Sequence, residues 1–170
     1  MPATSQTEKD GFLWVYEQEH QRTMRVLRAY PPEKTDFKPG PTNKTARELA
    51  WIFVGERGLG TKVWHDEFAN AAPSGKPAPP PEKWADILDA LEKAHKDFGD
   101  LVRSTSDEDL NKKVKFFVGP KTMGDYRRVD FAWFLIQDQI HHRGQFSVYL
   151  RAVGGKVPSI YGPSGDEPWF

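Results

Sequence analysis

Clusters of proline divide this chain of 170 residues into four segments whose apolar residues follow a helical period. In each segment, apolar side chains recur at steps of three and four, as they do on one face of an α-helix. The spacing predicts helices over residues 6–30, from Asn43 or Thr45 to Val63, over residues 82–103 and over residues 125–153. The first helix must end before Pro31 and Pro32, because proline cannot continue a helix.

Four such helices favour an all-α fold, a four-helix bundle with antiparallel neighbours. The proline-bearing connections are longer than a minimal up-and-down bundle needs, which leaves room for one or two crossovers. A chain of this length can bury a single core, and we expect one domain over residues 1–170. The short apolar run Val114–Val118, between the third and fourth helices, fits either a strand or a loop against the bundle.

The composition excludes several classes of function. Lys plus Arg equals Asp plus Glu at 24 each, so the chain offers no electrostatic footprint for a nucleic acid. Cysteine is absent, which excludes disulfides, thiolate ligands and cysteine nucleophiles and fits a reducing cytoplasm. No apolar run approaches the roughly 18 residues of a membrane span, and the polar N-terminus predicts no signal peptide. We therefore expect a cytoplasmic protein without nucleic-acid or membrane partners.

The run from Asp138 to Gln145, DQIHHRGQ, lies in the fourth predicted helix. Asp138 and His142 are four residues apart and therefore share a helix face about one turn apart. A carboxylate and an imidazole together suit a borderline or hard divalent cation. At about 100° per residue, Asp138, His142 and Gln145 fall on the same side as Phe131 and Phe134. This count predicts that all three polar side chains point into the core of the bundle.

The other helices also carry ionisable residues among their apolar positions. Glu56 lies in the apolar stripe of the second helix, His20 in that of the first and His95 in that of the third. Converging carboxylates and imidazoles could hold zinc, nickel, manganese or iron. The candidate ligands are Asp138, His142, Glu56 and His20.

A metal-free core is the alternative. A single histidine on an apolar face is more often a hydrogen-bonded core residue than a ligand, and this applies to His20 and His95. In such a core, Asp138 would pair with His20 or His142 in place of a metal ion.

A second apolar stripe of the fourth helix predicts an interface. Trp133, Ile136 and Ile140 lie on the side opposite Asp138. A helix that is apolar on two sides is either enclosed or contacts a partner. We therefore expect a homodimer that uses this face.

Four stretches of the sequence together carry a family resemblance: residues 138–151 (DQIHHRGQFSVYLR), 157–162 (VPSIYG), 45–56 (TARELAWIFVGE) and 37–39 (FKP). Through them the chain resembles the DinB/YfiT-like superfamily over nearly its whole length. The resemblance implies a four-helix bundle with a crossover, usually dimeric, and a three-histidine metal site. Some relatives transfer low-molecular-weight thiols such as bacillithiol, mycothiol or glutathione, or isomerise maleylpyruvate with a thiol cofactor. Many have no assigned activity.

The match to the three-histidine pattern is incomplete. The histidine expected in the second helix falls on Ile52, and the first of the pair in the fourth helix falls on Asp138. Only His142 is a histidine. Either the site is rebuilt around Asp138 and His142 with Glu56 or His20, or metal binding is lost.

Two functions are consistent with these residues. The first is a metal-dependent thiol S-transferase or hydrolase acting on a small molecule, with Glu56 as ligand or base and Tyr149 or Arg143 orienting the substrate. The alternative is a non-catalytic, metal-free bundle that binds a small ligand or a protein partner.

Overall fold

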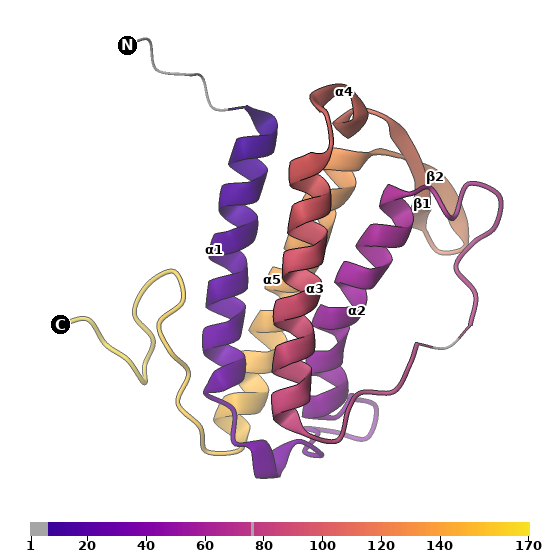
Figure 1. Ribbon diagram of the computed structural model, residues 1–170. Helices are drawn as coiled ribbons and strands as arrows, with labels where there is room; N and C mark the ends of the chain where they lie inside the picture. The colour runs from indigo at the N-terminus through magenta and orange to yellow at the C-terminus, as the bar shows by residue number, and fades with distance from the viewer. Residues whose placement is uncertain (1–6, 76) are drawn as a thin grey trace, which may run out of the picture.

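Within residues 7–75 and 77–170, which the computed structural model describes, four long helices lie side by side (Figure 1). These helices are α1 (Glu8–Arg28), α2 (Ala46–Trp64), α3 (Trp84–Ser104) and α5 (Arg128–Ala152). The shorter elements are the 3₁₀ turn η1 (Pro32–Lys34), the single-turn helix α4 (Asp107–Leu110) and the hairpin of β1 (Lys113–Gly119) and β2 (Thr122–Arg127). No helix in this described part of the chain is long and apolar enough to cross a membrane.

The helices do not simply alternate in direction. The helices α1 and α5 run one way, and α2 and α3 run the other way (Figure 1). Because α2 and α3 are parallel, the connection between Trp64 and Trp84 has to return along the length of the bundle. The indole of Trp51 donates to the carbonyl of Ala78 at 2.9 Å and holds part of this connection against α2. The predicted four-helix bundle with a crossover is confirmed.

A capping box fixes where α2 begins. The hydroxyl of Thr45 accepts from the backbone N–H of Glu48 at 3.2 Å, and the Glu48 carboxylate accepts from the backbone N–H of Thr45 at 2.7 Å. Two donors that a helix start leaves free are thereby satisfied. Of the two residues that the sequence offered as N-cap, Thr45 has this role.

The predicted start of the fourth long helix is wrong. Residues 125–127 belong to β2, which pairs antiparallel with β1, and Lys115 lies opposite Asp125. This oppositely charged pair and the neighbouring pair Val114–Tyr126 favour strands over a helix at this point. The run Val114–Val118, for which strand and loop were both open, is therefore a strand. The boundaries of the other three long helices lie within about two residues of the prediction, the usual uncertainty of helix ends.

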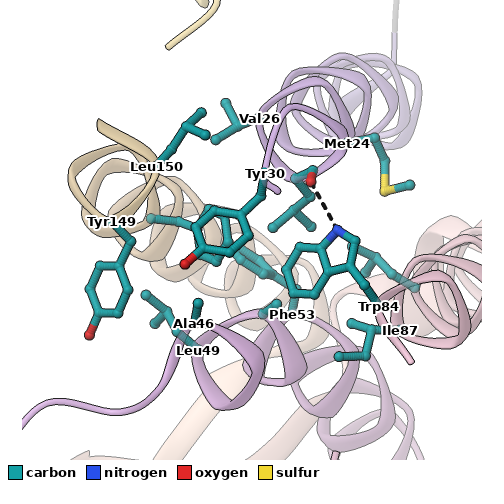
Figure 2. Packing of buried hydrophobic residues seen from close by; sticks show 14 of the residues in the cluster. Met24, Val26, Tyr30, Ala46, Leu49, Phe53, Trp84, Ile87, Tyr149 and Leu150 are labelled. Carbon is teal, nitrogen blue, oxygen red and sulfur yellow. Dashed lines mark hydrogen bonds between the residues drawn. The ribbon is translucent and has the colours of Figure 1, made fainter. Parts of the chain in front are cut away.

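The described core consists of two apolar clusters separated by a polar layer. One cluster joins the C-terminal halves of α1 and α5 to the N-terminal halves of α2 and α3 (Figure 2). There the indole of Trp84 donates to the carbonyl of Leu27 at 3.2 Å. The other cluster joins the opposite halves. Between them lie the buried polar residues Glu19, His20, Thr23, Glu56, Arg57, His95, Gln139 and Arg143.

Two glycines of α2 predict opposite effects of substitution by alanine. A Cβ at Gly60 would lie 2.7 Å from Leu135 and 2.9 Å from Phe98, whereas a Cβ at Gly58 meets nothing within 4 Å. Gly60→Ala should therefore lower the free energy of unfolding by about 1 kcal/mol or more through overpacking. Gly58→Ala, the matched control, should raise it by about 0.5–1 kcal/mol through helix propensity. Urea titration of both variants measures the difference, and equal effects would contradict close packing at Gly60.

Candidate metal centre

Three potential ligands from two helices converge near the middle of the bundle. Glu56 comes from α2, and Asp138 and His142 come from α5; one ligand atom of each lies within 4.8 Å of the others. Nε2 of His142 is 3.6 Å from Oε1 of Glu56 and 3.7 Å from Oδ1 of Asp138. These separations are too long for hydrogen bonds but suit three groups around a shared ion. Among the described residues, no other His, Asp and Glu side chains form such a group.

The three side chains differ in their access to solvent. The Asp138 side chain is 38% exposed and that of His142 18%, whereas Glu56 is buried. Oε1 of Glu56 is buried and has no hydrogen-bond partner within the described structure. Burial raises the pKa of Glu56 to about 8. The positive charge of Arg57 opposes this shift, and the nearby Asp138 adds to it. An ionised Glu56 is costly at this position unless a positive charge approaches Oε1.

The prediction that Asp138, His142 and Gln145 point into the core is wrong for Gln145, and Asp138 and His142 are only partly buried. Gln145 is exposed, and the side chains that α5 buries at this level are Gln139 and Arg143. The inward face is therefore rotated by about one residue, or roughly 100°. Partners on other helices explain the rotation, because an amide or guanidinium can be buried only when it is satisfied.

Those partners also set the position of the site. The guanidinium of Arg57 donates to Oε1 of Gln139, whose amide donates to the hydroxyl of Thr23 at 2.9 Å. Arg57 and Gln139 directly follow Glu56 and Asp138 in the sequence. The hydrogen bond between α2 and α5 thus brings the two carboxylates to the same level of the bundle.

The structure does not bring His20 to this group. Its ring stacks on His95 with centroids 3.6 Å apart, and its Nε2 lies 2.9 Å from a carboxylate oxygen of Glu92. Nε2 of His95 is 3.0 Å from Glu17 in the same way. His20, the fourth predicted ligand, is thus a hydrogen-bonded core histidine between α1 and α3. This is the alternative that the sequence left open for His20 and His95.

Glu56 is the residue of α2 that lies in this group, one turn after the position at which the family resemblance implies a ligand. Ile52, one turn earlier, is half-buried against the first apolar cluster and carries no ligand atom. The sequence reasoning missed Arg57, which is buried beside Glu56 and bonded to the carbonyl of Phe53 at 2.9 Å. An angular count along α2 could have found it, because Arg57 lies one turn after Phe53 on the buried side.

Comparison with known proteins identifies the family. The sequence model of the DinB family matches residues 5–168. The chain belongs to the DinB family. This DinB chain is 30% identical over 159 residues to the uncharacterized protein YrdA of Bacillus subtilis (strain 168), covering 93% of this chain and 90% of that protein.

Two crystal structures resemble this DinB chain. A DinB-like protein from Bacillus cereus ATCC 10987 superposes with a TM-score of 0.74 and 27% identity, over 89% of this chain and 97% of that one. A DinB-like protein of Bacillus subtilis, YjoA, gives a TM-score of 0.64 over 85% and 92% of the two chains. At 14% identity, the second likeness supports the fold alone.

The stacked histidines predict a loss of stability in acid. Burial, reinforced by His20, lowers the pKa of His95 to about 4, although Glu17 opposes this. The unfolded chain therefore takes up the proton first, and stability should fall by about 2 kcal/mol as the pH drops from about 6.5 to about 4. His95→Gln should reduce that loss in urea unfolding measured across this pH range. His65→Gln controls for the removal of an exposed imidazole, and an unchanged slope in His95→Gln would refute the assignment.

Proposed function

We propose that this DinB protein binds one divalent cation through Glu56, Asp138 and His142 and is a thiol S-transferase or hydrolase for a small-molecule substrate. The observation that carries the proposal is the buried, unpartnered Oε1 of Glu56 beside Nε2 of His142. Two carboxylate oxygens and one imidazole nitrogen suit zinc, manganese, iron or nickel. Three protein ligands also leave room in the coordination sphere for a substrate.

The three proposed ligands differ in their exposure, and this difference sets the side from which a substrate would reach a bound cation. A divalent cation held by Glu56, Asp138 and His142 would supply Lewis acidity, which would lower the pKa of a low-molecular-weight thiol or of water. Asp138 is the most exposed of the three ligands, so the substrate approaches from its side. Glu56 is buried and is assigned as a ligand and not as a base.

Two residues considered for substrate orientation have other partners. Arg143 is 2% exposed and pairs with Glu19 at 2.7 Å. The hydroxyl of Tyr149 donates to the carbonyl of Lys44 at 2.9 Å. The proposal therefore gives neither residue a role in substrate binding.

The metal-free bundle remains the competing function, and one observation favours it. A Glu56 carboxyl with a pKa of about 8 is uncharged near pH 7 and can stay buried without a cation. The hydrogen bond that a metal-free core would form between Asp138 and His142 is not present. Asp138 is partly exposed, and its Oδ1 lies 3.7 Å from Nε2 of His142, beyond hydrogen-bonding distance. In this case the bundle would bind a small ligand or a protein partner without catalysis.

Metal content distinguishes the two functions. Protein purified without chelators should contain about one ion per chain. Added zinc or manganese at about 100 times its dissociation constant should stabilise metal-depleted protein by about 2.7 kcal/mol. Asp138→Asn and His142→Ala should each weaken binding at least about tenfold, because each removes one of three ligands. Elemental analysis and thermal unfolding with and without metal measure both effects.

The controls are an exposed aspartate and an exposed histidine outside the site, changed as Asp89→Asn and His65→Ala. Both should bind metal as the unmodified protein does. If the unmodified protein neither contains nor takes up zinc, manganese, iron or nickel, the metal-dependent function is wrong and the metal-free bundle is favoured.

The proposal includes a homodimer formed through α5. Of the stripe predicted for this role, Ile136 is buried within the chain, whereas Trp133 and Ile140 are only partly buried. Val148, eight residues after Ile140, is 63% exposed and lies about 80° round the helix from it, at the edge of this side. Apolar side chains that a helix leaves partly or fully exposed on one side favour a protein interface there.

A charge at Ile140 tests the dimer. Ile140→Glu should halve the solution mass measured by light scattering, because an unpaired carboxylate would be buried at the interface. Ala85→Glu places the same charge at an exposed position of α3 and should leave the mass unchanged. A monomeric unmodified protein would contradict this part of the proposal.

A further inference from the structure

One side chain on the outer surface of α5 connects its two adjacent histidines. Gln145 is exposed and lies three residues after His142 and four after His141. Its Oε1 is 3.1 Å from Nδ1 of His142, and its Nε2 is 2.9 Å from Nε2 of His141. Both spacings place the side chains on neighbouring positions of one helix face, so the bridge is a local feature of α5.

The bridge has a consequence for the hydrogen on His142. An amide oxygen only accepts hydrogen bonds, so Nδ1 of His142 carries the hydrogen and donates it to Gln145. A neutral imidazole has a single N–H, and Nε2 of His142 is therefore left with its lone pair. That atom is the one that lies 3.6 Å from Glu56 and 3.7 Å from Asp138.

In this tautomer, the centre of the site contains acceptors from all three residues. The other tautomer would put an N–H between the two carboxylates, where it could satisfy them without a cation. With the hydrogen on Nδ1 and Glu56 ionised, the nitrogen and the carboxylate oxygens all present lone pairs to one point. The tautomer of His142 thus decides whether this group is suited to an ion or to an internal hydrogen bond.

His141 is the second partner of the Gln145 amide. The –NH₂ group of Gln145 can only donate, and Nε2 of His141 is within reach to accept. The opposite orientation would place the amide oxygen at His141 and a donor at Nδ1 of His142. His141, the first histidine of the HHRGQ run, is therefore outside the ligand group and contacts it through Gln145.

We propose that Gln145 is a positioning residue that holds His142 in its Nδ1–H tautomer, with its amide nitrogen donating to Nε2 of His141. The effect on metal affinity rests on the proposed function. The tautomer itself does not, because it can be measured in metal-free protein.

The test combines NMR of the histidine ring nitrogens in metal-free protein with zinc affinity measured by chelator competition. Gln145→Met removes both hydrogen bonds at an exposed position, and Gln145→Glu keeps an acceptor for His142. Gln145→Met should shift His142 towards the Nε2–H tautomer and weaken zinc binding about tenfold. Gln145→Glu should keep the Nδ1–H tautomer and bind zinc at least as tightly as the unmodified protein. His141→Phe should shift the tautomer in the same direction as Gln145→Met, to a smaller extent.

Gln137→Met is the matched control, because Gln137 is an exposed glutamine of the same helix outside the bridge. It should change neither the tautomer nor the affinity. An unmodified protein with His142 in the Nε2–H form, or a Gln145→Met variant with an unchanged tautomer, would overturn the inference. If the unmodified protein binds no zinc but has the Nδ1–H tautomer that Gln145→Met loses, the positioning role holds and the proposed function fails.

Discussion

The hydrogen bond from Arg57 to Gln139 is the contact on which the candidate site depends. It joins α2 to α5 inside the bundle, where both side chains are at most 4% exposed. A guanidinium buried without partners would cost several kcal/mol, so a slide of α2 along α5 that broke this contact would be strongly opposed. Because Glu56 and Asp138 are the residues immediately before Arg57 and Gln139, the same contact fixes the two carboxylates relative to each other. The position of the site thus follows from the hydrogen bond that the core provides to the buried guanidinium of Arg57.

The rest of the polar layer extends this effect to the whole bundle. Arg143 of α5 pairs with Glu19 of α1 at 2.7 Å, and the hydroxyl of Tyr161, in the C-terminal segment, donates to the same carboxylate at 2.7 Å. All four long helices contribute to this layer, and in each of them it lies between residues of the two apolar clusters. Apolar surfaces alone tolerate sliding better than hydrogen-bonded pairs do, since a displaced polar group loses its partner while a displaced apolar group finds another. We infer that the apolar clusters supply most of the stability, and that the polar layer determines how far each helix is shifted along its neighbours.

The sequence predicted those features that depend on local spacing. Helical periodicity and proline predicted the four helices, and the spacing of Asp138 and His142 predicted two members of the candidate group. Glu56 could be recognised because it lies among the apolar residues of its own helix. The inward face of α5 could not be recognised, because Gln139 and Arg143 are buried only through Thr23, Arg57 and Glu19 on other helices. His20 was misassigned for the same reason: its partner, Glu92, lies on α3, and nothing in the local sequence of α1 indicates it. The strand at residues 125–127 likewise depends on pairing with β1.

The replacement of histidines by carboxylates changes the electrostatics that a cation would meet. Three neutral imidazoles leave the charge of a divalent ion intact, whereas Glu56 and Asp138, once ionised, neutralise it. A more neutral centre is a weaker Lewis acid and lowers the pKa of a bound thiol or water less. Oxygen ligands also shift the preference from softer cations towards harder ones such as manganese. Arg57 opposes part of this change, because its guanidinium lies 3.5 Å from the second oxygen of Glu56 and competes with the cation for that carboxylate. Under the proposed function, a cation held by Glu56, Asp138 and His142 would therefore be a harder ion than the three-histidine pattern of the DinB resemblance implies, and it would lower the pKa of a bound thiol or water less.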